Sequence, residues 1–313
     1  MARILAADFG GTHLRAAIVD EGGRVEHRHA VESPDQREGV LPIVLALLER
    51  TAAAAGGGID ACCIASAGMI DARRGRVIIS PNIPGFRGLE MGAPAAELLG
   101  IPVWLENDAS AAALGEHRFG AGREYRHFAH LTLGTGIGGG LVLDGRLYRG
   151  SRGFAGEFGH MTIDPTGPDC SCGSRGCVEA FASGTAFARR AKRLVESGRS
   201  PLLAKVVGDD EPSGEHLLAA AQQGDPLSEA EIRNGGHCLG LGIGSLINLL
   251  NPEAITLSGG LLALGELYLE PMRKAIAATA FGPTTGVAIT ISELGEDAGL
   301  LGAAAVGLEY LGR

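Results

Sequence analysis

Residues 3–20 read RILAADFGGTHLRAAIVD, in which two apolar runs are joined by a turn rich in glycine. Arg3–Phe9 and Leu14–Asp20 each have the length and apolar content of a short buried strand. The same pattern returns at residues 129–147, AHLTLGTGIGGGLVLDGRL, where Gly134 stands 124 residues after Gly10. We interpret the two stretches as a degenerate internal duplication, in which each half opens with a glycine-rich hairpin.

The other apolar patterns predict strands and helices in both halves. Strands are predicted at residues 61–65, 101–105 and 253–258, and helices at 40–55 and 299–311. The alanine-rich run after Glu106 and Asn107 predicts a helix with Asp108 as its N-cap. Residues 201–215 are polar and contain glycine and proline, which predicts a loop. This mixture predicts an α/β protein whose halves meet near residue 110.

The composition limits the function. The 313 residues are 45% hydrophobic, enough for the core of two domains. The net charge is −9 without a long basic run, which disfavours nucleic acid as a partner. No signal segment precedes the first strand pattern, and no apolar run is long enough to span a membrane. We therefore expect a cytoplasmic protein with reduced cysteines, of which Cys62, Cys63 and Cys238 lie in apolar patterns typical of a core.

The other three cysteines lie in residues 157–177, EFGHMTIDPTGPDCSCGSRGC. Cys170, Cys172 and Cys177, together with His160, form the one-histidine, three-thiolate set of closed structural zinc sites. A closed site has no open position for water, so a zinc ion here would shape the loop and would not catalyse a reaction. The alternative is that the three cysteines are unliganded surface thiols.

The two glycine turns suit phosphate. A turn without Cβ atoms presents backbone N–H groups to phosphate oxygens, and the hydroxyls of Thr12 and Thr135 would add donors. Asp8, at the end of the first strand, could hold Mg²⁺ through water, because this ion prefers carboxylates and phosphates. Either turn alone is also explained as a plain hairpin turn. Neither matches the pattern of a P-loop.

The chain resembles the ROK family of bacterial sugar kinases, within the actin/hexokinase/Hsp70 superfamily, along essentially its whole length. The resemblance rests on DFGGTHLR (8–15), LENDASAAALGE (105–116), LGTGIGGGLV (133–142), GEFGHM (156–161) and CSCGSRGCVEAFASG (170–184). It implies two related ribonuclease-H-like (actin-like ATPase) domains with a cleft between them. The first domain would be residues 1–109 joined by the helix at 299–313, and the second residues 110–298 with the zinc loop.

The resemblance also implies an activity and its residues. The expected enzyme transfers the γ-phosphate of ATP to the 6-hydroxyl of a hexose, most simply glucose, with Mg²⁺ and a structural Zn²⁺ as cofactors. Asp108 would be the catalytic base, and His160 would contact sugar and zinc through its two ring nitrogens. The implied phosphate segments are Gly10, Gly11, Thr12 and Gly134, Thr135, Gly136; Gly259 and Gly260 would border the adenosine; Asn82, Asn107, Asp108, Glu157, His160 and Glu179 would bind the sugar; and His160, Cys170, Cys172 and Cys177 would hold the zinc.

Several alternatives stay open. Asp108 would cap a helix whatever the function, and Glu157 and Glu179 could be solvated surface acids. The hexose could be N-acetylmannosamine, allose, fructose or mannose, polyphosphate could replace ATP, and the chain could be a non-catalytic sugar sensor. Ala67 stands where the family usually has proline. The first strand leaves no room for the DNA-binding domain of the family's repressors, and the family implies a homodimer.

Overall fold

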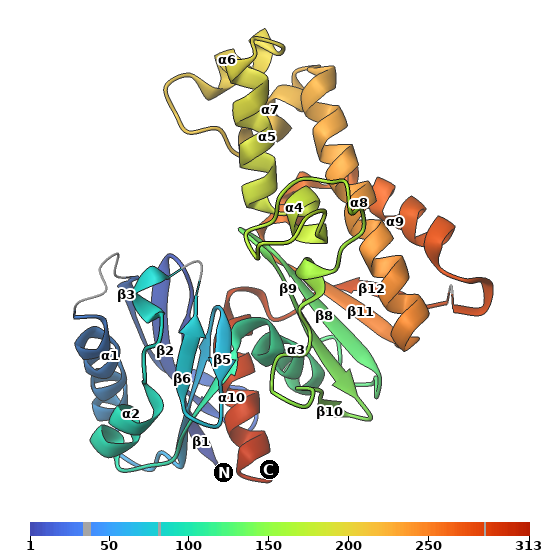
Figure 1. Ribbon diagram of the computed structural model, residues 1–313. Helices are drawn as coiled ribbons and strands as arrows, with labels where there is room; N and C mark the ends of the chain where they lie inside the picture. Colours follow the sequence, from blue (N-terminus) through green and yellow to red (C-terminus); the bar gives the residue numbers. More distant parts are fainter. Residues whose placement is uncertain (34–38, 81–82, 285) are drawn as a thin grey trace. The chain divides into compact units, whose positions relative to one another are not determined.

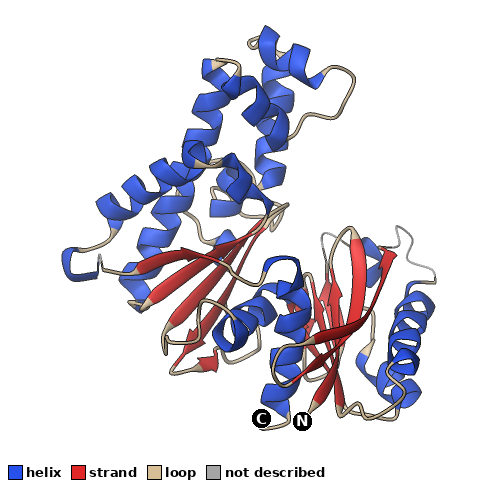
Figure 2. Cartoon of the chain, turned by 180° about the vertical axis from the view of Figure 1, so that it is seen from behind, coloured by secondary structure: helices blue, strands red, loops and turns tan. Residues whose placement is uncertain are grey.

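The structure is a computed structural model, which describes residues 1–33, 39–80, 83–284 and 286–313. Within these ranges the chain forms a mixed α/β fold with two five-stranded sheets and a two-stranded sheet (Figure 1, Figure 2). The α/β class predicted from the sequence is confirmed. The chain divides into two compact units. Unit 1 contains residues 1–130, 140–156 and 290–313, and unit 2 contains residues 131–139 and 157–289.

The sheet of unit 1 has the strand order β3-β2-β1-β4-β7. Its strands are β1 (Arg3–Phe9), β2 (His13–Asp20), β3 (Val25–Glu32), β4 (Ala61–Ser66) and β7 (Val103–Asn107). β1 is antiparallel to β2 and parallel to β4, and β4 is parallel to β7. Phe9 pairs with Ser66 and Ser66 with Asn107, so the carboxyl ends of the three parallel strands meet at one edge.

Alternating side chains of β1 enter two different cores. Leu5 and Phe9 belong to one buried cluster, and Ile4 and Ala6 to another. A strand that is buried on both faces is expected to be apolar throughout, which is what residues 3–9 show. The adjacent cysteines of β4 divide in the same way, since Cys62 lies in the first cluster and Cys63 in the second. Their prediction as core residues is confirmed, as is that of Cys238.

Helices cover both faces of this sheet. The first cluster contains residues of α1 (Val40–Ala54) and α2 (Gly92–Leu99), and the second contains residues of α3 (Asp108–Phe119) and α10 (Ala298–Tyr310). A small antiparallel hairpin, β5 (Met69–Asp71) with β6 (Arg76–Ile79), follows β4. In Figure 1 the red helix α10 lies beside the blue strand β1, although the two are at opposite ends of the chain.

The second sheet has the order β10-β9-β8-β11-β12, which repeats the third-second-first-fourth-fifth order of the first sheet. Its strands are β8 (Phe128–Leu133), β9 (Ile137–Leu143), β10 (Arg146–Leu147), β11 (Ala254–Ser258) and β12 (Ala288–Ile291). The repeated order agrees with the internal duplication inferred from the two glycine-rich stretches.

The helices of unit 2 are α4 (Val178–Ala182), α5 (Gly184–Glu196), α6 (Pro201–Val207), α7 (Gly214–Gln222), α8 (Pro226–Leu250) and α9 (Glu266–Thr279). The loop predicted at residues 201–215 is therefore wrong over its first half. Ser200 accepts a hydrogen bond from the Leu203 N–H and Pro201 occupies the first turn. A serine cap followed by proline begins helices well, whereas the prediction treated Pro201 as a breaker.

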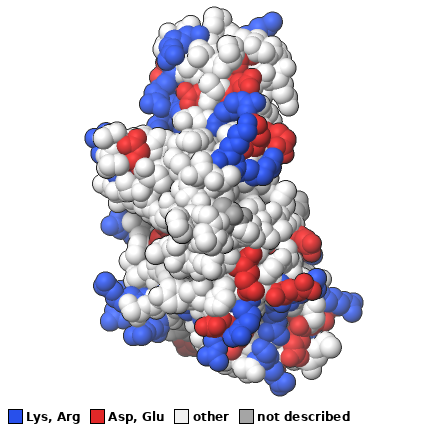
Figure 3. Space-filling view, turned by 90° about the vertical axis from the view of Figure 1, so that its right-hand side faces the viewer, with Lys and Arg blue, Asp and Glu red and all other residues white. Residues whose placement is uncertain are grey.

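None of the described helices is long and apolar enough to cross a lipid bilayer. On the face drawn in Figure 3, blue Lys and Arg side chains lie among red Asp and Glu side chains, with wide uncharged areas between them.

The contact between α3 and α10 requires glycine. A Cβ built at Gly302 would lie 2.6 Å from the carbonyl carbon and oxygen of Ala111, which cannot move independently of α3. We predict that Gly302→Ala lowers the free energy of unfolding by about 1–3 kcal/mol, as overpacking does. Urea unfolding measures it. The matched control is Gly214→Ala, a helical glycine whose Cβ would meet its nearest neighbour at 3.6 Å. Equal stabilities of the two variants would contradict the prediction.

Candidate functional site

The two glycine-rich turns have the same pattern of hydrogen bonds. In each, carbonyl groups accept hydrogen bonds, while two N–H groups have no acceptor among the described residues. In the first turn, Ser33 donates from its N–H to the Thr12 carbonyl at 3.0 Å and from its hydroxyl to the Gly10 carbonyl at 2.6 Å. The N–H groups of Gly11 and Thr12 make no hydrogen bond with any residue in the described ranges. These donors are available to an anion, as a phosphate-binding nest requires.

The second turn, in unit 2, is held by the start of α5. The N–H groups of Gly184 and Thr185 donate to the carbonyls of Gly134 and Thr135, at 2.9 and 3.1 Å. Among the residues that the structure describes, none accepts from the N–H groups of Thr135 and Gly136. This turn therefore offers the same kind of nest as the first.

Gly259 follows β11 and lies beside the end of β8. Its φ is +105°, and a Cβ there would lie 2.2 Å from the Leu133 carbonyl oxygen, so only glycine fits. Leu133 immediately precedes the second turn. Gly260, in contrast, has open space where a Cβ would point, which leaves that position accessible.

Asp8 lies next to the last residue of β1 and is partly buried. A Cβ at Gly299, in the first turn of α10, would lie 2.3 Å from its carboxylate. Burial, and next the charge of Asp108, raise the pKa of Asp8 to about 6, while the charge of Arg15 lowers it. A carboxylate held in this way is destabilised when ionised, and a cation would relieve it. Its position suits the predicted contact with Mg²⁺ beside the first turn.

Asp108 is the first residue of α3, and the N-cap is Asn107. The prediction of Asp108 as the cap is wrong, because Asn107 Oδ1 accepts the Ser110 N–H at 3.0 Å while Asp108 already has a helical backbone. Asp108 Oδ1 instead accepts the N–H of Ala109 at 2.9 Å and the side-chain N–H of Asn107 at 3.0 Å. Burial raises the pKa of Asp108, and these hydrogen bonds oppose the rise.

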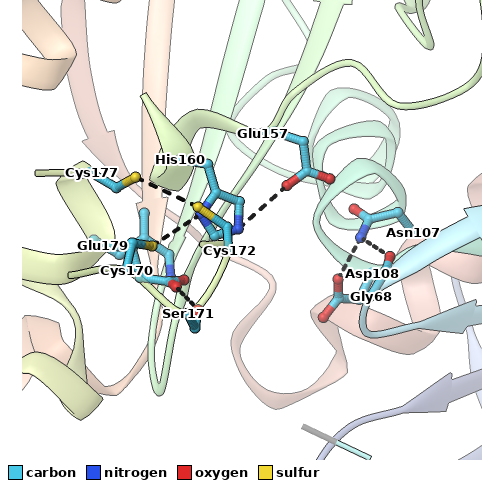
Figure 4. A network of polar contacts seen from close by, with 11 residues as sticks. Gly68, Asn107, Asp108, Glu157, His160, Cys170, Ser171, Cys172, Cys177 and Glu179 are labelled. Carbon is cyan, nitrogen blue, oxygen red and sulfur yellow. Dashed lines mark hydrogen bonds and ion pairs between the residues drawn. The ribbon is translucent and has the colours of Figure 1, made fainter. Parts of the chain in front are cut away.

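Asn107 also ties this corner to the neighbouring strand. Its Nδ2 donates to the carbonyl of Gly68, at 3.1 Å, as Figure 4 shows. The asparagine therefore caps α3, orients the Asp108 carboxylate and joins the end of β7 to the segment after β4. Both the oxygen and the nitrogen of the Asn107 side chain make these hydrogen bonds. A sugar hydroxyl that contacts Asn107 would therefore share atoms that already have partners within the protein.

Glu106, the residue before Asn107, is held in place by contacts from two distant parts of the chain. Glu106 is 3% exposed, and its Oε2 lies 2.6 Å from Arg149 Nε. Arg149 also pairs with Glu309 of α10 at 2.6 Å and lies over the Tyr310 ring, which stacks on Trp104. Burial raises the pKa of Glu106, and Arg149 opposes the rise. Sequence reasoning did not find this anchor.

The predicted metal ligands come together in unit 2. The ligand atoms of His160, Cys170, Cys172 and Cys177 all lie within 4.8 Å of one another. Cys172 Sγ is 3.8 Å from Cys177 Sγ, and His160 Nδ1 is 3.6 Å from Cys170 Sγ (Figure 4). A tetrahedral zinc with its usual bond lengths would place two sulfurs about 3.8 Å apart, and sulfur and nitrogen about 3.6 Å apart. The donor set and its spacing fit structural zinc.

The second ring nitrogen of His160 faces away from the sulfurs. His160 Nε2 is 4.0 Å from Glu157 Oε2, and both side chains are partly exposed. With Nδ1 on the metal side, Nε2 is the nitrogen that can meet a polar ligand, in agreement with the expected use of both nitrogens.

Glu179 joins the metal loop to the second glycine turn. Its Oε2 accepts the N–H of Ile137 at 2.9 Å, and its Oε1 accepts the hydroxyl of Ser171 at 3.3 Å. A Cβ at Gly136 would lie 2.5 Å from Oε2, so a side chain at that position would displace the Glu179 carboxylate. Glu179 is thus not a solvated surface acid, and a direct sugar contact stays a prediction. Asn82, predicted to bind the sugar, lies outside the described residues.

The comparisons with known proteins agree on one family. A model of the ROK family matches residues 4–309. The glucokinase of Streptomyces coelicolor is 38% identical over 314 residues, which cover 97% of this chain and 97% of that protein. The crystal structure of a ROK family glucokinase from Streptomyces griseus in complex with glucose and AMPPNP is 37% identical, with a TM-score of 0.82, over 97% of this chain and 99% of that one. A putative xylose repressor from Caldicellulosiruptor sp. is 31% identical over 97% of this chain but 77% of its own length. The chain belongs to the ROK family.

The raised pKa of Asp8 has a measurable consequence. In the folded protein the pKa of Asp8 is about 6, which is higher than the ordinary 3.8. Ionisation of Asp8 therefore destabilises the folded state. This cost grows above about pH 4 and reaches its full size above about pH 6. We predict that Asp8→Asn stabilises the Mg²⁺-free protein at about pH 8, by on the order of 1–3 kcal/mol, and has little effect at about pH 4. Urea unfolding at the two pH values measures it. The control is Asp209→Asn at an exposed aspartate, and destabilisation by Asp8→Asn at the higher pH would contradict the prediction.

The metal cluster gives a second test. We predict one zinc per chain, and that Cys172→Ala loses it and is destabilised by about 3 kcal/mol or more, because the fold around the loop depends on the ion. Metal analysis and thermal unfolding measure both effects. Ser174→Ala, in the same loop but without a ligand atom, is the control and should keep the metal. Wild-type protein that contains no stoichiometric zinc would refute the assignment.

Proposed function

We propose that the chain is an ATP-dependent hexokinase that transfers the γ-phosphate of ATP to the 6-hydroxyl of a hexose, with glucose as the first candidate. The substrate follows from similarity over almost the whole chain to proteins named glucokinase, one of which binds glucose and AMPPNP. The observation that carries the chemistry is the Asp108 carboxylate, fixed in orientation where β1, β4 and β7 end.

Asp108 is the proposed general base. It would accept the proton of the 6-hydroxyl as that oxygen attacks the phosphorus, and it would orient the hydroxyl by the same hydrogen bond. A base works best when its pKa approaches the working pH, and burial moves the pKa of Asp108 in that direction. Asn107, by donating to Asp108 Oδ1, fixes the carboxylate before substrate arrives.

The free N–H groups of the two glycine turns would bind the phosphates of ATP. Asp8 would hold Mg²⁺ beside the first turn, and the bound ion supplies neutralisation of the charge on the phosphates. Gly259 and Gly260 would border the adenosine. Because the donors are backbone groups already held in place, they need little reorganisation when the charge develops.

The sugar would be bound by Asn82, Asn107, Glu157, His160 and Glu179. The metal ligands would be His160, Cys170, Cys172 and Cys177. They would fix the loop that carries Glu157 and His160 and the start of α4, which carries Glu179. Zinc supplies no step of the reaction in this proposal. Its chemistry is to hold one ring nitrogen of His160 so that the other keeps its direction and tautomer.

The wider organisation is also part of the proposal. Residues 1–109 with 299–313, and residues 110–298, would form two ribonuclease-H-like domains with the substrates in a cleft between them. Reduced thiols suitable for zinc support a cytoplasmic location. A homodimer is the expected assembly.

A coupled assay of ADP release tests the activity. Glucose should give the highest kcat/KM in a panel with N-acetylmannosamine, allose, fructose and mannose, and ATP should be compared with polyphosphate as donor. Preference for another hexose would correct the substrate. Binding of a sugar, measured by calorimetry, without turnover of any would overturn the kinase and favour a sensor.

The proposed base can be tested by one substitution. We predict that Asp108→Asn lowers kcat by about 10²–10⁴-fold, as loss of a general base does, while glucose still binds. Steady-state kinetics and calorimetry separate these two effects. Asp209→Asn removes the same charge from an exposed loop and should leave kcat unchanged. Near-normal turnover by Asp108→Asn would show that another group takes the proton.

A further inference from the structure

A cavity of about 480 Å³ in unit 2 is lined by four arginines. It lies beside residues 166–175 of the metal loop and is bordered by α4, α5 and α8. The arginines are Arg175 of the loop and Arg189, Arg190 and Arg193 of α5. No role proposed above uses this cavity.

The acidic groups near the cavity are fewer than its arginines. Arg175 Nε pairs with Asp169 Oδ1 at 2.9 Å, and Arg190 Nε lies 2.8 Å from Glu231 Oε2. Arg189 and Arg193 form no ion pair with any residue in the described part of the chain. Two positive charges at the cavity therefore have no carboxylate partner.

Arg190 is the buried member of the group. It is 6% exposed, and its Nη2 has no hydrogen-bond acceptor. Its Nε is near Glu231 but does not meet the geometry of a hydrogen bond, and its guanidinium lies over the Phe187 ring at 4.7 Å. Burial lowers the pKa of Arg190 and the charge of Glu231 opposes this, while the charges of Arg189 and Arg193 add smaller contributions that lower it. A buried guanidinium with incomplete partners is costly unless another negative charge is supplied.

A structural role explains only part of this arrangement. Arg189 Nη2 donates to the Ala180 carbonyl at 2.8 Å and Arg190 Nη1 to the Phe181 carbonyl at 2.6 Å, so both cap the end of α4. Neutral carbonyls do not balance charge, and Arg193 takes no part in the cap. An anion in the cavity would balance the positive charge that these carbonyls leave unbalanced.

We propose that this cavity binds a phosphate monoester or inorganic phosphate, with Arg189 and Arg193 as its main charged partners. A doubly charged phosphate matches the two unpaired arginines, and the planar guanidinium fork matches phosphate oxygens. The shared chemistry is the phosphate group. The proposal does not depend on the proposed kinase activity, since none of its residues belongs to that site.

Calorimetric titration of the zinc-containing protein tests the proposal, with inorganic phosphate in one arm and glucose 6-phosphate in the other. Arg193→Gln is the first variant, because this exposed side chain makes no hydrogen bond or ion pair with a described residue and its loss should not disturb folding. Arg189→Gln is the second. Lys192→Gln removes the same charge from the next residue of α5, outside the cavity lining. Hexose phosphorylation is measured for every variant.

We expect wild type and Lys192→Gln to bind the probe alike, and Arg193→Gln to weaken binding about tenfold or more, as loss of a charge-assisted hydrogen bond does. The same loss in both arms assigns the site to phosphate itself, and a loss with glucose 6-phosphate alone assigns it to a sugar phosphate. Binding that is absent in both arms, or equal in wild type and Arg193→Gln in both arms, overturns the proposal. So does self-association that Arg193→Gln removes without change in phosphate binding, because acidic groups of a second copy would then be the partner. Phosphate binding in a protein that phosphorylates no hexose would leave this site standing and refute only the kinase.

Discussion

The carboxylate of Glu179 is the contact on which the candidate site of unit 2 depends. One oxygen accepts from the backbone next to the second glycine turn, and the other accepts from Ser171, which lies between two of the metal ligands. A turn with free N–H groups and a loop shaped for zinc are therefore joined through one side chain. Order in the loop is transmitted to the turn because the buried N–H of Ile137 would otherwise lose its acceptor. In the proposed reaction, this contact connects the metal loop to the second glycine turn although zinc takes no step.

In unit 1 the carboxylates differ in how far neighbouring groups balance their negative charge. Glu106 is paired with Arg149, so its charge is balanced and its role is to anchor the corner before α3. Asp108 receives hydrogen bonds from Asn107 and Ala109, and no cationic side chain in the described part of the chain forms an ion pair with it. Asp8 is stabilised by the charge of Arg15, but burial and the charge of Asp108 outweigh it and raise the pKa of Asp8 to about 6. The two carboxylates whose charge is less fully balanced are the ones proposed to bind the cation and to accept the proton. A carboxylate that is fully paired with a cation has no capacity left for either role.

Much of the fold could be predicted from local patterns. The strands β1 and β2 and the glycine turn between them follow from apolar runs that tertiary packing reinforces, since β1 is buried on both faces. Predictions failed where two local rules competed. Asn107 and Asp108 are both good caps, and the choice fell to Asn107 because its amide can also reach the Gly68 carbonyl. Pro201 is compatible with the interruption of a helix or with its first turn. The hydrogen bond from the Leu203 N–H to the Ser200 side chain favours the start of a helix.

The sequence by itself determined the residue types of the site: a carboxylate after a strand, two glycine turns, and three thiols with an imidazole at zinc spacing. These are decided over a few residues, where backbone geometry and ligand spacing are local properties. Only the tertiary structure decided what supports them. Arg149 reaches Glu106 across 43 residues and Glu309 across 160, and Glu179 reaches Ile137 across 42. Such contacts depend on which strands and helices become neighbours, and no local pattern encodes that choice.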